Sequence, residues 1–517
     1  MQSNRISGEQ PNHFIQTSPP QEVRSEQTIY TATIGLEVHV QLKTKSKMFC
    51  SCKVEYGAEP NTHTCPICLG LPGALPSINE EALHLTTLAG LMLECAIPPV
   101  CKFDRKNYFY PDMPKNYQIS QFDQPLCLGG AVPLHQRAYP KDVQKTEVAA
   151  EKKIRLTRIH LEEDVAKSFH LGTTSGIDFN RAGTPLMEIV SEADIASPEE
   201  AFAYLSALRQ ILVYGNISDA DMEKGQMRCD VNVSIRPQGQ KEYGTKIELK
   251  NLNTISGVRR ALAFEIERQT AVLLAGGSLA QETRRWDDDR GETTLMRIKE
   301  SSHDYRYFTD PDLLPLHTEK LVLAATKVMP ELPQAKRDRF IKEYEISDYD
   351  AAVLTDDLAL ASYFEESVTA ALKTSSTIKP KILANWIIND LLSALSTASL
   401  TLAECSVTPP SLAELIVLIE KGTISGRQGK EVFAEMMASG TAATVIVQEK
   451  GLEQVSDSSA IEAFCDQVIA AHPSVVADFK AGKEVALNFL KGQVMKLSKG
   501  KANPALAGEI LVSRLAD

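Results

Sequence analysis

The sequence has no apolar run of the length that a membrane-spanning helix needs. Such a helix takes about 18–20 consecutive apolar residues, and no stretch of that length in this 517-residue chain is both apolar and free of charge. The first 28 residues lack the apolar core of a secretory signal, and Glu9, Glu22 and Glu26 argue against an organellar transit peptide. These absences predict a soluble, cytoplasmic protein with no membrane partner. The Pro, Ser, Gln and Asn content of residues 1–28 predicts a disordered tail.

Positive charge is also in short supply. The chain has 55 Lys and Arg against 67 Asp and Glu, which gives a formal net charge of −12 at pH 7. A protein that coats nucleic acid without sequence preference would be basic, so the composition argues against that class. A local basic patch that binds nucleic acid stays compatible with it, because phosphate contacts are local. The length predicts about three domains.

The familiar nucleotide-binding motifs are missing as well. The sequence contains no G-x-x-x-x-G-K-[ST] loop, no Gly-rich kinase loop and no Rossmann fingerprint. Gly239 and Gly244 have the spacing of the first motif, but Thr245 and Lys246 follow them in the wrong order. No internal repeat of solenoid period occurs either. A nucleotide site in this chain must therefore be of another kind.

What the sequence does contain is a set of strands with unusual polar faces. Residues 31–42 place Glu37, His39 and Gln41 on one face and aliphatic residues on the other. A half-solvated antiparallel sheet would explain any one such strand. Asp, Asn and Glu are disfavoured in strands, however, and they recur in three more segments. These polar faces comprise His160, Glu162 and Asp164; Asp230, Asn232, Ser234 and Arg236; and Lys246, Glu248 and Lys250.

The chemistry of these faces points to phosphate and a divalent cation. Carboxylates and histidine can hold Mg²⁺, and Lys or Arg can bind phosphate. A sheet face that carries both suits phosphoryl transfer, which depends on positioning and on charge neutralisation. From the residues alone, the prediction stops at an Mg²⁺–phosphate face, and it fixes neither the ligands nor the substrate.

The cysteines give a sharper signal. Cys50-x-Cys52 and Cys65-x-x-Cys68 form two close pairs separated by twelve residues. Four thiolates at this spacing predict a structural, tetrahedral Zn²⁺ site, with four buried free thiols as the alternative and His63 as a spare ligand candidate. Clustered cysteines without an export signal also favour a reducing compartment. The isolated cysteines are predicted to be small core residues: Cys95, Cys101, Cys127, Cys229, Cys405 and Cys465.

The second part of the chain has the periodicity of helices. Apolar residues recur at helical spacing in 319–328, and residues 385–392 predict a second amphipathic helix. Thr408-Pro409-Pro410 is a break, after which Ser411 and Glu414 have the spacing of a capping box. We therefore expect a tail at 1–28, a sheet-based domain at 29–318, a helical domain at 319–408 and a helical tail domain at 409–517.

Several long and irregular motifs follow the order known from one family. They are Ile34–His39, Pro66–Pro76, Asn107–Ser120, Ile159–Asp164, Asn180–Leu186, Met227–Ser234, Glu248–Asn253, Glu282–Trp286, Asp304–Phe308, Gly492–Lys496 and Lys499–Pro504. From about residue 29 onward, the chain resembles the B-subunit family of the aspartyl/glutamyl-tRNA amidotransferases.

The resemblance implies a function and a set of partners. In this family an A subunit hydrolyses glutamine to ammonia, and a small C subunit joins A to B in a heterotrimer. The B subunit binds Glu-tRNA(Gln) or Asp-tRNA(Asn), phosphorylates the esterified side-chain carboxylate with ATP and amidates it. The complex is thus an ATP-dependent carbon–nitrogen ligase with glutamine as amido donor. The implied fold is α+β: a sheet-based catalytic cradle, a helical domain and a small all-α tail domain.

The resemblance also assigns roles to residues. It places the catalytic metal–nucleotide site at Glu37, His39, Glu162 or Glu163, and Glu248, with His39, Glu162 and Glu248 as the Mg²⁺ ligands. The candidates for phosphate contacts are Arg228, Lys246 and Lys250, and the cofactors are ATP, Mg²⁺ and a structural Zn²⁺. In the basic tail segment, contacts to the tRNA are expected from Lys491, Lys496, Lys499 and Lys501.

Two alternatives stand beside this interpretation. A non-catalytic tRNA-binding scaffold could keep the fold, but it would not need Glu37, His39 or Glu248. The archaeal-type relative carries an inserted domain after the cradle, and residues 308–330 leave no room for one. The choice between Glu-tRNA(Gln) and Asp-tRNA(Asn) as substrate stays open.

Overall fold

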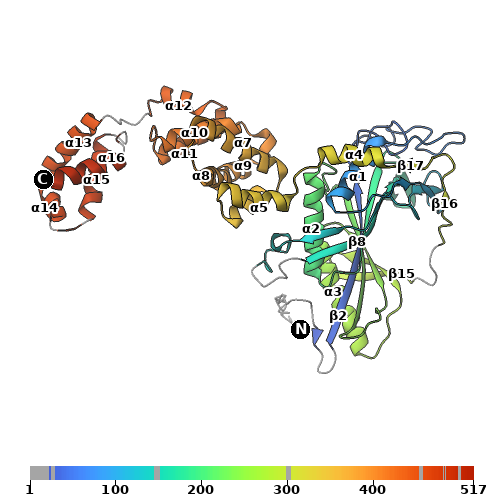
Figure 1. Ribbon diagram of the computed structural model, residues 1–517. Coiled ribbons are helices and arrows are strands. Elements are labelled where there is room, and N and C mark those ends of the chain that lie inside the picture. The colour runs from blue at the N-terminus through green and yellow to red at the C-terminus, as the bar shows by residue number, and fades with distance from the viewer. Residues whose placement is uncertain are drawn as a thin grey trace, which may run out of the picture. The chain divides into compact units, whose positions relative to one another are not determined.

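The chain forms two compact units, Met1–Leu332 and Pro333–Asp517 (Figure 1). No helix in the described part of the chain is long and apolar enough to cross a membrane. The expected tail at 1–28 lies outside the described residues, apart from Val23–Arg24, which pairs with Tyr30 and Ile29. The computed structural model describes residues 23–24, 29–144, 152–298, 304–452, 458–480, 482–483, 485–498, 502 and 504–516.

In the described part of the chain, the first unit is built on a ten-stranded sheet. Its strands follow the order β15-β14-β13-β12-β2-β11-β8-β6, with β1 beside β2 and β7 beside β8. Neighbours are antiparallel except β13 and β14, which are parallel. The strands are β1 (Val23–Arg24), β2 (Ile29–Gln41), β6 (Cys127–Leu128), β7 (Ala131–Leu134), β8 (Lys152–Glu163), β11 (Pro185–Ser191), β12 (Met227–Pro237), β13 (Ile247–Leu252), β14 (Glu282–Asp287) and β15 (Glu292–Ile298).

Smaller elements complete this unit. Three short ladders join β16-β4-β5, β9-β10 and β17-β3. The strands are β3 (Val100–Cys101), β4 (Asp104–Asn107), β5 (Tyr117–Ser120), β9 (Lys167–Leu171), β10 (Thr174–Asp178), β16 (Phe308–Thr309) and β17 (Leu316–His317). The helices are α1 (Glu80–Met92), η1 (Gln136–Ala138), α2 (Pro198–Tyr214), α3 (Ile255–Leu274) and α4 (Glu319–Val328).

The alternation predicted for residues 31–42 is present in β2. Ile34, Val38 and Val40 are fully buried, whereas Glu37 and His39 lie on the opposite face. α3 contacts β12, β13 and β15, and α2 packs beside α3, so the two helices cover one face of the sheet (Figure 1). The other face, which we call the open face, carries the carboxylates and the histidine.

The two covering helices begin at well-defined caps. Ser197 Oγ accepts a hydrogen bond from the backbone N–H of Glu200 at 3.1 Å, and Pro198 occupies the first turn of α2. Thr254 Oγ1 accepts from the N–H of Gly257 at 2.9 Å and starts α3 directly after β13. α3 is thus the crossover that makes β14 parallel to β13.

The second unit is helical, and its described residues form two hydrophobic cores. The first core extends from Phe340 to Val447 and the second from Ile461 to Leu515. The helices are α5 (Pro333–Tyr344), α6 (Asp348–Leu354), α7 (Leu358–Thr374), α8 (Pro380–Asn385), η2 (Trp386–Leu391), α9 (Leu392–Ala398), η3 (Leu402–Glu404), α10 (Pro409–Glu420), α11 (Gly426–Ser439), α12 (Ala443–Glu449), α13 (Ser458–Ala471), α14 (Pro473–Lys480), α15 (Val485–Leu497) and α16 (Pro504–Ala516).

The α+β class and the order of sheet and helices are confirmed, but the packing divides the chain at other positions than the expected ones. α4 packs on α1 and therefore belongs to the first unit. α7 and α10 pack together, so the boundary expected at 408/409 falls inside one core. A Pro-Pro pair marks the start of a helix here and leaves the domain continuous.

Two local predictions for the helical region can be compared with the structure. The helix expected over 385–392 is present, and Trp386–Leu391 forms a π-helical segment within it. The capping box expected at Ser411 is wrong. α10 begins earlier, at Pro409, with Thr408 Oγ1 accepting from the Ser411 N–H at 3.4 Å. Proline fits the first turn because its missing N–H would have no helical partner there.

Candidate active site and metal centre

Three neighbouring strands bring two histidines and two glutamates together on the open face. In the ladder, Glu188 on β11 lies opposite His39 on β2 and His160 on β8. Glu188 Oε2 is 3.3 Å from both His39 Nε2 and His160 Nε2, and Glu162 Oε1 is 3.4 Å from His39 Nε2. His39, Glu162 and Glu188 offer ligand atoms that all lie within 4.8 Å of one another. We call these three residues the carboxylate–histidine cluster.

The charges in this cluster are tightly coupled. Burial opposes ionisation of His39, but its hydrogen bond to Glu188 and the charges of Glu162, Glu188 and Asp230 raise its pKa to about 9. Burial would raise the pKa of Glu188, yet His160 and His39 hold it well below its usual value. Burial, followed by the charges of Glu188 and Asp230, raises the pKa of Glu37. The cluster therefore attracts positive charge strongly.

The residues fit a divalent cation. Mg²⁺ prefers carboxylate oxygens, and an imidazole nitrogen can complete such a set. The Glu162 side chain is buried, and its Oε2 atom has no hydrogen-bond partner among the described residues. A buried carboxylate oxygen without a donor is costly, and a cation held between Glu162, Glu188 and His39 would remove that cost.

A second row of polar residues continues across the sheet from this cluster. Glu37 Oε1 accepts from Asn232 Nδ2 at 3.0 Å, and Asn232 pairs with Glu248 in the ladder. Glu248 Oε2 accepts from Thr283 Oγ1 at 2.9 Å, and its Oε1 lies 3.2 Å from Lys250 Nζ. Glu37 and Glu248 thus share the open face with His39, but neither belongs to the cluster of three.

The three cations expected to contact phosphate differ in their surroundings. Arg228 is paired with the buried Asp164, and Lys250 is paired with Asp230 and Glu248. Lys246 is exposed and precedes β13. Their role in binding phosphate stays a prediction.

Glu163 lies apart from its neighbour Glu162, because successive side chains of a strand point to opposite sides. Its Oε1 accepts from Lys115 Nζ at 2.5 Å and from the N–H of Ile119 at 3.0 Å. Lys115 and Glu163 line a cavity of about 210 Å³ whose other wall includes Cys50 and Cys68. Of the two glutamates left open by the sequence, the structure brings Glu162 to His39.

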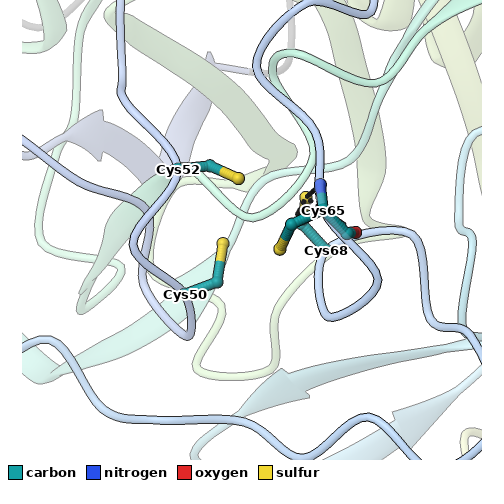
Figure 2. A group of neighbouring side chains, drawn as sticks. All are labelled: Cys50, Cys52, Cys65 and Cys68. Atoms are coloured by element: carbon teal, nitrogen blue, oxygen red, sulfur yellow. Dashed lines mark hydrogen bonds between the residues drawn. The ribbon is translucent and has the colours of Figure 1, made fainter.

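The four cysteines expected to bind zinc converge from two loop segments (Figure 2). Their sulfur atoms all lie within 4.8 Å of one another, and those of Cys65 and Cys68 are 3.8 Å apart. Zn–S bonds of about 2.3 Å in a tetrahedron place sulfurs about 3.8 Å apart, so the spacing fits this ion. His63, the spare candidate, is outside the group and lies 3.8 Å from Glu55 Oε2.

A buried lysine completes the surroundings of this cysteine centre. Lys47 is 1% exposed, and its Nζ donates to Cys68 Sγ at 3.4 Å and to the carbonyl of Phe179 at 3.1 Å. The hydrogen bond from Cys50, followed by further contacts that include the charge of Lys47, lowers the pKa of Cys68 to about 4. Burial raises the pKa of Cys52 to about 11. One thiolate is therefore already favoured before any ion binds.

Two of the four lysines expected to contact tRNA lie on one helix of the second unit. Lys491 and Lys496 are on α15, where Lys491 is half-buried beside Gly508 of α16 and Lys496 is exposed. Lys499 and Lys501 lie outside the described residues.

The structure adds two residues to the expected site, Glu188 and His160. His160 was visible as part of an alternating polar face, but it carried no assigned role. Glu188 was missed because it sits in the apolar run Pro185-Leu-Met-Glu-Ile-Val190, where alternation gives no polar face. The available signal was one acidic residue in the middle of an otherwise apolar strand, which is rare unless the charge is paired.

Comparison with known proteins identifies the family of this chain. Residues 32–324 match the model of the GatB/GatE catalytic domain, and residues 362–515 match that of the GatB domain. The aspartyl/glutamyl-tRNA(Asn/Gln) amidotransferase B subunit of Methylacidiphilum infernorum is 56% identical over 493 residues, covering 94% of this chain and 99% of that protein. Its counterpart in Opitutus terrae is 52% identical, with 94% and 99% covered, and that in Persephonella marina is 49% identical, with 93% and 98% covered. The chain therefore belongs to the family of aspartyl/glutamyl-tRNA amidotransferase B subunits.

Proposed function

We propose that the open face activates the side-chain carboxylate of Glu-tRNA(Gln) or Asp-tRNA(Asn) with ATP and then amidates it. The chain does so as the B subunit of a glutamine-dependent amidotransferase, with ammonia supplied by an A subunit and with a C subunit completing the heterotrimer. The observation that carries this proposal is the carboxylate–histidine cluster of His39, Glu162 and Glu188 on the open face.

The chemistry needs two steps. An oxygen of the substrate carboxylate attacks the γ-phosphorus of ATP, the bond from that phosphorus to the β–γ bridging oxygen breaks, and ADP leaves. Ammonia then attacks the carbonyl carbon of the acyl phosphate, phosphate departs with the electron pair of the C–O bond, and a proton is released. Activation is required because oxide is a poor leaving group, whereas phosphate is a good one.

The residues on the page can support the first step by positioning and by electrostatics. His39, Glu162 and Glu188 would hold Mg²⁺, which when bound supplies charge neutralisation for phosphate oxygens. Asn232 orients Glu37, and Thr283 orients Glu248, so both carboxylates are fixed before substrate arrives. Lys250 and Arg228 keep neighbouring acids neutralised.

We assign supporting roles to two other parts of the chain. The cysteine centre would hold a structural Zn²⁺, because a closed set of four thiolates leaves no position for substrate. The tail helices would contact the tRNA backbone through Lys491 and Lys496. Lys496→Gln should weaken tRNA binding several-fold and lower the slope of affinity against salt by about one phosphate contact, as measured by filter binding at several salt concentrations.

The proposal is tested with the reconstituted heterotrimer. Wild type, His39→Ala and Glu248→Ala receive Glu-tRNA(Gln) or Asp-tRNA(Asn), Mg²⁺, [γ-³²P]ATP and either glutamine or ammonium chloride. We expect wild type to amidate with both nitrogen donors and both variants to fail with both. Ammonium chloride bypasses the A subunit, and glutaminase activity measured separately shows that the complex has assembled.

Two outcomes would contradict the proposal. If the variants amidate at the wild-type rate, the open face is not the site of activation. If wild type binds both misacylated tRNAs but never consumes ATP, the chain is a tRNA-binding scaffold. The charged residues gathered on the open face do not favour that second interpretation, since a scaffold has no use for a costly row of buried acids.

A further inference from the structure

Apart from Thr283, which orients Glu248, the residues of the motif Glu282–Trp286 have no role in the function described so far. The motif forms most of β14, next to β13 and two positions from β12 in the sheet. Its side chains alternate between the two faces. Arg284 lies on the helix side, where its Nε is 3.5 Å from Glu265 Oε2 of α3, and Trp286 packs against Phe264 of the same helix.

Thr283 and Arg285 therefore point to the open face. Thr283 confirms this orientation, because its hydroxyl donates to Glu248. In the parallel ladder Glu248 pairs with Thr283, and Lys250 pairs with Arg285. Arg285 thus extends the row formed by Asp230 and Lys250 by one more strand.

Arg285 differs from the cations already assigned to this face. Arg228 is paired with Asp164, and Lys250 with Asp230 and Glu248, so their charges are already offset. Arg285 is exposed, and among the described residues its guanidinium takes part in no hydrogen bond or ion pair. A side chain with five donors is held on the open face beside this acidic site with its charge uncompensated.

A triphosphate needs such a group. The open face carries more carboxylates than cations, so the negatively charged phosphates of a nucleotide are repelled unless further positive charge is supplied. Guanidinium binds phosphate oxygens in a bidentate fashion and remains charged at every working pH. From the strand spacing, β14 lies about 14 Å from β2 across three ladder steps, so Arg285 is on the part of the open face away from the carboxylate–histidine cluster.

We infer that Arg285 binds the polyphosphate chain of ATP at the end of the open face remote from His39. This inference rests on the proposed function, because it takes ATP as the substrate of this face. The residues of the Glu282–Trp286 motif then have two kinds of role. Arg284 and Trp286 hold the strand against α3, whereas Thr283 orients Glu248 and Arg285 binds phosphate.

The test compares Arg285→Gln, Arg285→Lys and Arg290→Gln in the reconstituted heterotrimer. Arg290 is a matched control, since it lies in the turn after the same strand, is 70% exposed and loses the same charge. The apparent KM for ATP and for Glu-tRNA(Gln) are measured separately. Inorganic tripolyphosphate serves as a competitive inhibitor, because it carries the phosphates without base or ribose.

Loss of one charge-assisted hydrogen bond predicts about a tenfold to hundredfold rise in the KM for ATP in Arg285→Gln. The inhibition constant of tripolyphosphate should rise by a similar factor, and Arg285→Lys should recover part of both. The KM for Glu-tRNA(Gln) should stay unchanged, and Arg290→Gln should behave as wild type. Thermal melting checks that the variants fold.

Other results would overturn the inference. An unchanged KM for ATP in an active Arg285→Gln enzyme excludes the contact and leaves the proposed function intact. A rise in the KM for Glu-tRNA(Gln) alone would show that Arg285 contacts the tRNA and not ATP. An equal rise in the KM for ATP in Arg290→Gln would show that any loss of positive charge near this strand weakens ATP binding, and that Arg285 makes no specific contact. A wild-type enzyme that does not consume ATP would remove the proposed function and the inference together.

Discussion

The cysteine centre and the open face lie in the same unit, but they are built in opposite ways. The four cysteines come from one short stretch, Cys50 to Cys68, and no described strand of the main sheet contains them. The ligand atoms of the open face come from β2, β8 and β11, where ladder hydrogen bonds fix each strand. A loop needs its ion to keep its shape, whereas a sheet holds its ligands in place without one.

This contrast predicts that the two sites respond differently to damage. Substitutions in the open face should abolish amidation and leave the stability of the fold unchanged. Changes in the cysteine centre should weaken the fold and reduce chemistry less.

The largest effect is expected from Glu188→Gln. Glu188 contacts both His39 and His160, so the neutral amide should disrupt the carboxylate–histidine cluster and lower the rate of amidation by about 10²–10³-fold. Single-turnover amidation with ammonium chloride measures this, and thermal melting should show a folded protein. Glu192→Gln, just past the end of the same strand, where Glu192 accepts from Thr157, is the matched control. Similar rates in both variants would contradict the assignment of Glu188.

Cys65→Ser with Cys68→Ser tests the other half of the comparison. The double variant should lose bound zinc and about 2–5 kcal/mol of unfolding free energy, while amidation at 25 °C falls less than in Glu188→Gln. Metal analysis and thermal denaturation measure the two quantities. Cys405→Ser controls for the loss of a thiol elsewhere. If the double variant lost zinc but kept the stability of wild type, the cysteine loop would hold its shape without an ion. The contrast with the open face would then be wrong.

The pH dependence of metal binding separates the sites further. The pKa of His39 lies above its ordinary value, at about 9. Its ion pairs therefore stabilise the metal-free fold fully below pH 6.5, and this contribution disappears as the pH rises through 9. A cation that binds His39 must displace the proton, so Mg²⁺ affinity should rise by about tenfold per pH unit up to pH 9. Calorimetry with wild type and His39→Asn measures this, and a flat profile in wild type between pH 7 and 9 would exclude His39 as a ligand.

The smallest effect is expected from Lys47→Met. This change keeps the length of the side chain and removes the buried cation beside Cys68. Zinc affinity should fall by about tenfold, as is typical when a group that contacts a metal ligand is lost. In Lys47→Arg, which keeps the charge, zinc affinity should fall less. Competition with a chromogenic chelator measures the affinity. Wild-type affinity in Lys47→Met would show that the thiolates need no neighbouring charge.

The sequence could predict whatever depends on neighbours in the chain. Alternation in residues 31–42 placed Glu37 and His39 on one face, and the cysteine spacing identified a four-thiol cluster. It could not predict pairings between distant strands. Glu188 meets His39 only through the ladder, Asp164 neutralises Arg228 from 64 positions away, and Thr283 orients Glu248 from 35 positions away. Those contacts decide which acids and cations remain available, and no local pattern contains them.

The position of β2 in the sheet has a consequence for synthesis of the protein. Among the described residues, β2 is the long strand of the main sheet that is translated earliest, yet its long neighbours along the sheet, β11 and β12, are translated much later. Asn232, which orients Glu37, follows it by 195 positions. Throughout that interval β2, beyond its pairing with β1 at Ile29 and Tyr30, presents unpaired edges and an aliphatic face, the combination that invites aggregation. The nascent chain should therefore depend on chaperones until residue 237 has emerged, and the open face cannot be completed before then.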